Sequence, residues 1–151
     1  ALWYTELLRK KGLLDDATAR ATLTDSIQWA FGHISRGLFD SEGKRSVYST
    51  IAAIQIGHFV DEGAISFDPL LDPQESGDKG RFRIYHDRLG PAVEKLMQRT
   101  GRILAKGDQA DAEALIRTYT EGAGIDKIKL KLVQERLLRF PKESFSYAIL
   151  L

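Results

Sequence analysis

The sequence predicts a mainly α-helical domain of about six helices around a central helix at residues 46–63, with one small β-hairpin at 64–68 and 81–87. Three observations predict this fold. Apolar residues recur at helical spacing along most of the chain, glycines and prolines separate the periodic segments, and only two short runs alternate with a period of two. We therefore expect a single helical domain over residues 1–151.

The composition is that of a globular protein with balanced charge. The chain has 22 Lys and Arg against 21 Asp and Glu, 43% hydrophobic residues and no cysteine. A net charge of +1 gives no electrostatic basis for binding nucleic acid or an anionic membrane, and neither is expected as a partner. No run reaches the length of about 18 apolar residues that a membrane span needs. The lack of cysteine excludes a thiolate metal site and fits a reducing compartment such as the cytoplasm, while a periplasmic location stays open.

The N-terminal part predicts two helices. Residues 1–11 have a helical apolar pattern with basic residues at its C-terminal end, and Gly12 ends it. Because no N-cap residue precedes this pattern, we expect the chain to be a fragment of a longer protein that begins inside a helix. Asp15 or Asp16 is the expected cap of the second helix, which ends at Gly37. The apolar stripe of this helix contains Leu23, Ile27, Ala30, Phe31 and Ile34.

The segment 46–63 is the most continuously apolar stretch that is long enough for a helix. Its apolar residues fall on nearly all sides, which is typical of a helix that other helices surround. One stripe contains Val47, Ile51 and Ile54, and we expect Ile54 to lie in the core. Gly63 is the expected C-cap, because glycine adopts the left-handed conformation that commonly ends a helix.

Two runs that alternate between apolar and polar residues, 64–68 and 81–87, predict the β-hairpin. The polar connection between them is longer than the common hairpin loops of about 2–5 residues. After the second run, Pro91 fits the first turn of a helix that ends at Gly107.

The C-terminal part predicts two further helices. Asp108 is the expected cap of one, and Asp126 is the expected cap of the last helix, which Pro141 ends. The tail beyond Pro141 is strongly apolar, and we expect it to pack on another surface, either of this chain or of missing sequence.

No complete active site is recognisable from residue types and spacing. The three histidines, His33, His58 and His86, lie on separate predicted elements, and none has a second histidine four residues away that could share a zinc ion. Only His58 has an acidic residue at that spacing, Glu62, and we interpret it as a histidine of the core or the helix end. No catalytic residue and no metal ligand are therefore expected in this chain. Three acidic pairs are interpreted as solvated: Asp15 with Asp16, Asp61 with Glu62, and Asp72 with Glu75.

Five short motifs each occur once, in a fixed order along the chain. They are A-L-W-Y at 1–4, G-L-L at 12–14, D-E-G-A at 61–64, G-D-x-x-x-A-x-x-L-x-x-x-Y at 107–119, and R-F-P at 139–141. In order and spacing, this set resembles the C-terminal part of the dipeptidyl peptidase III family of zinc metallopeptidases. The resemblance covers nearly the whole chain.

The resemblance implies a role within a larger enzyme. That family holds zinc through the two histidines of an H-E-x-x-G-H segment and a glutamate of a later E-E-x-R-A-[DE] segment, and this chain contains neither segment. The implied zinc ligands therefore lie upstream of Ala1, in a parent enzyme whose zinc activates a water for peptide hydrolysis. This chain would be inactive alone, form one wall of the cleft and scaffold the zinc site. Its implied partners are the upstream part of the same polypeptide and a peptide substrate.

The resemblance also singles out one candidate substrate-binding residue. The family has an H-x-x-x-R pair on the long helix, towards the cleft, and counting back from Ala64 places its His at Tyr48 and its Arg at Ala52. Both are departures from the family pattern. Tyr48 could donate a hydrogen bond to a substrate carbonyl or a developing oxyanion, whereas Ala52 can replace nothing that a guanidinium does. Four alternatives stay open: Tyr48 as an ordinary helix residue, a parent enzyme of a divergent branch with other substrate contacts, a pseudo-peptidase, and a non-catalytic helical interaction module.

Overall fold

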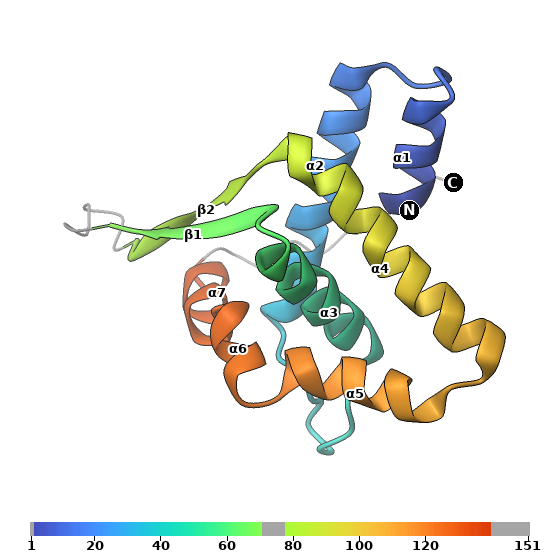
Figure 1. Ribbon diagram of the computed structural model, residues 1–151. Coiled ribbons are helices and arrows are strands. Elements are labelled where there is room, and N and C mark those ends of the chain that lie inside the picture. Colours follow the sequence, from blue (N-terminus) through green and yellow to red (C-terminus); the bar gives the residue numbers. More distant parts are fainter. Residues whose placement is uncertain (1, 71–77, 140–151) are drawn as a thin grey trace, which may run out of the picture.

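The computed structural model describes residues 2–70 and 78–139, which form a mainly helical domain with one small antiparallel hairpin (Figure 1). The predicted fold class is confirmed. The apolar C-terminal tail and most of the connection within the hairpin lie outside the described residues. The elements of the described ranges are α1 (Leu2–Lys10), α2 (Asp16–Ile34), α3 (Val47–Asp61), β1 (Ile65–Pro69), β2 (Gly80–Ile84), α4 (His86–Lys106), α5 (Gln109–Thr120), α6 (Ala123–Lys127) and α7 (Leu130–Leu137).

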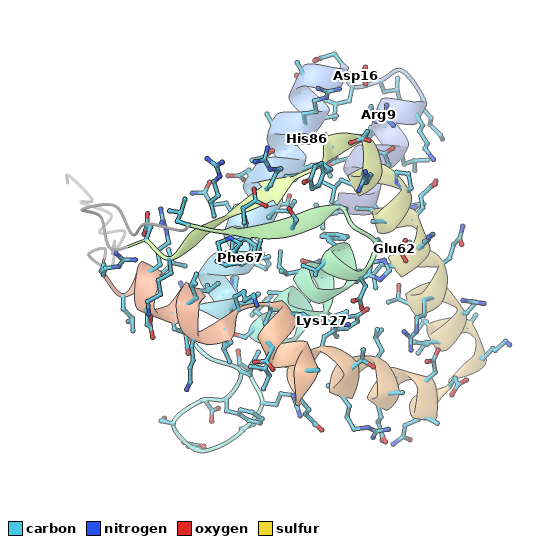
Figure 2. All side chains as sticks on the ribbon, turned by 60° about the vertical axis from the view of Figure 1, so that its left-hand side comes forward. Arg9, Asp16, Glu62, Phe67, His86 and Lys127 are labelled. Carbon is cyan, nitrogen blue, oxygen red and sulfur yellow. The ribbon has the colours of Figure 1, made fainter. Side chains whose placement is uncertain are left out.

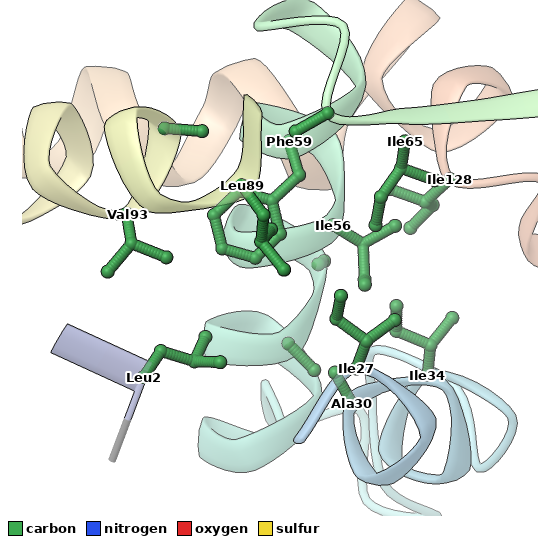
Figure 3. Close-up of a cluster of buried hydrophobic side chains, with 14 of the residues drawn as sticks. Leu2, Ile27, Ala30, Ile34, Ile56, Phe59, Ile65, Leu89, Val93 and Ile128 are labelled. Atoms are coloured by element: carbon green, nitrogen blue, oxygen red, sulfur yellow. The ribbon is translucent and has the colours of Figure 1, made fainter. Parts of the chain in front are cut away.

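Helix α3 lies at the centre of the domain, as predicted for residues 46–63. It contacts α2, α4, α5, α6 and β1, and Figure 1 shows it between α2 and α5. Its inner side, which we define as Ala52, Ala53, Ile56 and Phe59, is 0% exposed. Figure 3 shows Ile56 and Phe59 among buried apolar side chains from α2, α4 and β1. The helix stops where expected, because Gly63 adopts a left-handed φ of 65°.

The opposite side of α3 is open. This outer side, which we define as Val47, Tyr48, Ile51 and Ile54, includes three residues that are exposed, by 67% at Val47, 61% at Tyr48 and 43% at Ile51. The expectation that Ile54 lies in the core is wrong, since its side chain is only partly buried. The apolar pattern could not reveal this difference, because α3 is apolar on both sides.

The hairpin pairs β1 with β2 in an antiparallel register that places Phe67 opposite Phe82. The second strand is shorter than the predicted 81–87, because α4 begins at His86. The amide of Tyr85 still donates to the carbonyl of Ala64, at 2.9 Å. The carbonyl of the same residue then accepts from the amide of Leu89, which starts the helix.

The predicted helix start at Pro91 is also wrong. This proline lies inside α4, beyond its first turn. Because proline has no amide hydrogen, one backbone bond of the helix stays unmade there.

The C-terminal helices confirm one predicted cap and correct one boundary. Asp108 caps α5 by accepting a hydrogen bond from the amide of Asp111, at 3.0 Å. The single helix predicted from Asp126 is instead two helices, α6 and α7. Lys129 separates them with a φ of 52°, a left-handed conformation that is uncommon for residues other than glycine. Ile128, just before this turn, is fully buried.

Candidate functional site

Tyr48 lies in the first turn of α3 and belongs to a group of three aromatic rings at the surface. Its ring centroid is 5.3 Å from that of His33 and 6.1 Å from that of Trp29, to which it is edge-on at 89°. The rings of Trp29 and His33 lie 4.1 Å apart. We call Trp29, His33 and Tyr48 the aromatic cluster. Trp29 is 49% exposed and Tyr48 is 61% exposed, so a ligand could reach both rings.

Two local features position the aromatic cluster. Trp29 and His33 are four residues apart on α2, a spacing that places them on the same face of the helix. Ser49, the neighbour of Tyr48, is buried, and its hydroxyl donates to the carbonyl of His33 at 2.8 Å. This bond holds the first turn of α3 against the last turn of α2, and thereby holds Tyr48 beside His33.

The polar atoms of the aromatic cluster are available to a ligand. Within residues 2–70 and 78–139, the indole of Trp29, the imidazole of His33 and the hydroxyl of Tyr48 make no hydrogen bond. Partial burial, and to a lesser extent the charge of Arg36, lower the pKa of His33 below its ordinary value of 6.5. At neutral pH this imidazole is therefore uncharged, with one donor and one acceptor nitrogen. Together the cluster offers aromatic surface and hydrogen-bonding groups, a combination that suits a peptide group or an amide.

The second position implied by the family resemblance lies in a different environment. Ala52 is 0% exposed and belongs to the hydrophobic core, although it is only one helical turn from Tyr48. A guanidinium at this position would be buried among apolar side chains, which is unfavourable without a charged partner. The structure therefore separates the two positions, with Tyr48 open to solvent and Ala52 in the core.

An apolar groove lies on the same side of α3, between α1, α4 and α5. Its volume is about 260 Å³. Trp3, Ile51 and Met97 in its wall are 38%, 43% and 42% exposed, so they present apolar surface to solvent. Its walls are formed by Leu2, Trp3, Ile51, Ile54, Gln55, Phe59, Val93, Leu96, Met97, Thr100 and Leu115, and we call it the apolar groove.

The other histidines make separate contacts. His58 does not pair with Glu62: its Nε2 lies 2.9 Å from the carbonyl oxygen of Ala92, while Glu62 binds Lys95. His86 has a buried Nδ1 without a hydrogen-bond partner among the described residues. Within those residues, no group of three or more histidine, aspartate or glutamate side chains is arranged to hold a metal ion.

The interpretation of Asp61 as simply solvated is incomplete. Its carboxylate is partly exposed but accepts a hydrogen bond from the hydroxyl of Tyr119 at 3.0 Å and contacts the ammonium of Lys127 at 2.6 Å. Burial, and then the bond to Asp61, raise the pKa of Tyr119, which stays protonated at neutral pH. Of the other acidic pairs, Asp72 and Glu75 lie outside the described residues.

A partly buried ion pair near the N-terminus was missed by sequence reasoning. Glu6 on α1 is 2% exposed and accepts hydrogen bonds from the Nε and Nη2 atoms of Arg9. Arg9 also contacts Asp16, the first residue of α2, at 3.2 Å, and Figure 2 labels both residues where the two helices meet. The three-residue spacing of Glu6 and Arg9 is a signal for such a pair, but it does not reveal burial.

Comparisons with protein families, curated proteins and solved structures give no match to this chain. The resemblance to dipeptidyl peptidase III therefore rests on the ordered sequence motifs alone, and a peptidase role for this chain is a proposal. Among the helices of residues 2–70 and 78–139, none combines the length and apolarity needed to cross a membrane.

Proposed function

We propose that this chain is the C-terminal helical portion of a zinc-dependent peptidase resembling dipeptidyl peptidase III. In this proposal it forms one wall of the substrate cleft and scaffolds a zinc site whose ligands belong to the upstream part of the polypeptide. Because the zinc ligands are proposed to lie upstream, no catalytic step is assigned to this chain, and in this proposal the chain alone is inactive. The ordered motifs support this proposal, and the helical fold with one small hairpin is compatible with it.

The structural observation that supports the proposal is the environment of Tyr48. The motif spacing assigns this residue to a cleft-facing position, and its side chain is exposed beside two other aromatic rings. Its hydroxyl has no hydrogen-bond partner among the described residues, so it can donate to a substrate carbonyl without first breaking a bond within that part of the protein. Trp29 and His33 extend this surface with aromatic area that a peptide can pack against.

Zinc-dependent release of dipeptides from peptide N-termini by the full-length parent protein tests the proposal. We expect Tyr48→Phe to lower kcat/KM at least about tenfold, since one hydrogen bond to the reacting group is lost. Tyr4→Phe is a matched control, because Tyr4 is 60% exposed on α1 and lies outside the aromatic cluster. Full activity of Tyr48→Phe would remove Tyr48 from the site. A parent without zinc-dependent activity, or without an H-E-x-x-G-H segment, would contradict the peptidase proposal itself.

The apolar groove favours a second candidate function, a non-catalytic helical interaction module or a pseudo-peptidase. Exposed apolar side chains such as those of Trp3, Ile51 and Met97 mark surfaces that commonly bind another protein segment. In the peptidase proposal the upstream part of the same polypeptide covers this groove, whereas in an interaction module a separate protein does.

Ile51→Asp distinguishes these two arrangements. In this chain alone the substitution places a charge on exposed surface, and we expect a change in unfolding free energy within about 0.5 kcal/mol. In the full-length parent, an upstream segment packed on the groove would bury that charge, and destabilisation of several kcal/mol is expected. Chemical denaturation of both proteins measures the difference. Equally small effects in both would show that the upstream chain leaves the groove open, as an interaction module requires.

A further inference from the structure

A larger cavity lies between α2, the hairpin and α7, and it is separate from both the aromatic cluster and the apolar groove. Its volume is about 630 Å³, within the range of about 300–1,000 Å³ that is typical of small-molecule sites. We call it the hairpin pocket. Its walls are formed by Thr24, Ile27, Gln28, Phe31, Gly32, Leu70, Asp78, Gly80, Arg81, Phe82, Ile84, Leu132, Val133, Arg136 and Leu137.

The interior of the hairpin pocket is apolar and partly aromatic. Ile27 from α2 and Val133 from α7 are 2% and 4% exposed, and they form part of its floor. The ring of Phe82 lies 4.5 Å from that of Phe31, and both line the pocket, so an aromatic wall joins α2 to the hairpin. A hydrocarbon group that entered this pocket would lose its contact with water against a largely preformed apolar surface.

One arginine at the rim of the pocket is available to an external anion. The carboxylate of Asp68 is occupied by Arg83, which donates from Nε at 3.0 Å and from Nη2 at 2.9 Å and lowers the pKa of Asp68. Arg81, which lines the pocket, has its Nε 4.0 Å from the same carboxylate, too far for a hydrogen bond. Its side chain is 68% exposed, and its guanidinium donates no hydrogen bond to the described residues.

The part of the rim near the end of α7 is also positively charged. Asp78, just before β2, is held by two arginines of the α7 end, Arg136 and Arg139. These contacts lower the pKa of Asp78, so its carboxylate is ionised and carries one negative charge against two positive ones. Among the described residues that line the pocket, Arg81 and Arg136 are positively charged and Asp78 is negatively charged, so this part of the rim has a net positive charge over an apolar interior.

We propose that the hairpin pocket binds an amphiphilic anion, a fatty carboxylate, with its hydrocarbon chain in the apolar interior and its carboxylate on Arg81. The charge of the rim selects an anion, and the planar guanidinium can donate two parallel hydrogen bonds to a carboxylate. The shape and apolarity of the interior select an alkyl chain rather than a small hydrophilic anion. This site is independent of the peptidase proposal, because it uses none of the residues of the aromatic cluster or the apolar groove.

Calorimetric titration of the full chain with decanoate, below its micelle concentration at neutral pH, is the first test. Saturable binding near one decanoate per chain is the expected result. Decanol and decyltrimethylammonium have the same alkyl chain without the negative charge, and each is expected to bind at least about tenfold more weakly because it lacks the charge-assisted contact. Absence of saturable decanoate binding, or equal affinity for all three compounds, would overturn the proposal.

Gly32→Leu tests where the alkyl chain lies. Gly32 lines the pocket on α2, and a Cβ placed on it meets no atom within 4 Å, so a leucine side chain can occupy the pocket without strain. Leucine also favours a helix more than glycine does, so the variant is expected to fold. We expect decanoate binding to be lost. Gly101→Leu is the matched control, since Gly101 lies within α4 in equally open space, and it should bind decanoate like the unsubstituted chain.

Arg81→Gln tests where the carboxylate lies. Removing the guanidinium is expected to weaken decanoate binding about tenfold while leaving the weaker decanol binding unchanged. Arg102→Gln removes the same charge from the exposed surface of α4 and is expected to leave both affinities unchanged. Unaltered decanoate binding in both Gly32→Leu and Arg81→Gln would place the ligand elsewhere and refute this site.

Discussion

The two sides of α3 are similarly apolar in sequence but differ in what covers them. Ala52, Ala53 and Ile56 on the inner side are 0% exposed, whereas Val47 and Ile51 on the outer side are 67% and 43% exposed. The inner side combines two small residues, Ala52 and Ala53, with the large side chains of Ile56 and Phe59, and all four pack against neighbouring elements. The outer side has branched and aromatic residues that border the apolar groove and the aromatic cluster. Hydrophobicity therefore selects α3 as the central helix, but it does not distinguish the packed side of this helix from its open side.

The two sides of α3 should differ most in the loss of stability that a buried charge causes. Ile56→Asp places an unpaired carboxylate on the fully buried inner side, and we expect it to cost about 4 kcal/mol or more and to unfold much of the population. Ile51→Asp makes the same chemical change on the outer side, where a change within about 0.5 kcal/mol is expected. Urea denaturation followed by circular dichroism measures both. Similar losses for the two variants would mean that the outer side is also covered in solution.

A smaller effect is expected where α3 meets α5. A Cβ added to Gly57 would lie 2.3 Å from the Cδ1 atom of Tyr119, whose ring is buried and tied to Asp61. Gly57→Ala is therefore expected to destabilise the domain by about 1–3 kcal/mol through overpacking, despite the better helix propensity of alanine. In Gly101→Ala the added Cβ meets open space, so that variant should gain up to about 1 kcal/mol. Thermal unfolding of the two variants measures the difference in stability. A higher melting temperature for Gly57→Ala than for the unsubstituted chain would contradict the tight contact between position 57 and the ring of Tyr119.

The smallest effect on stability is expected from the protonation of His33, which lies beside Tyr48 on the outer side of α3. Because the folded-state pKa of His33 lies below the ordinary value of 6.5, the unfolded chain binds this proton more tightly. The corresponding stabilisation is present above pH 6.5 and is lost as the pH falls below that value. The difference in melting temperature between about pH 7.5 and 5.5 should thus be smaller in His33→Gln than in the unsubstituted chain. An unchanged difference would mean that His33 is as well solvated in the folded state as in the unfolded one.

Much of the fold was predictable from local signals. The central helix, the hairpin and the cap at Asp108 follow from periodicity and from residue types with specific backbone preferences. The errors occurred where local signals were absent or ambiguous. The left-handed turn at Lys129 has no glycine to mark it, and the alternating run up to residue 87 equally fits the beginning of α4 at His86.

The candidate site was predictable only in part. The motif spacing singled out Tyr48, and the structure exposes this residue. Trp29 and His33 were not predicted as its neighbours, because their contact with Tyr48 depends on how α2 packs against α3. Their four-residue spacing was visible in the sequence, but such spacing does not show which element lies opposite. The hairpin pocket depends in the same way on contacts between segments that are distant in the sequence.

Asp61 links the end of α3 to two later helices at once. Its carboxylate holds the hydroxyl of Tyr119 on α5 and the ammonium of Lys127 on α6. A fluctuation that withdraws this one side chain therefore loosens both helices together instead of fraying them one by one. We therefore expect α5 and α6 to open together with the end of α3, and their amide protons to exchange with solvent at similar free energies.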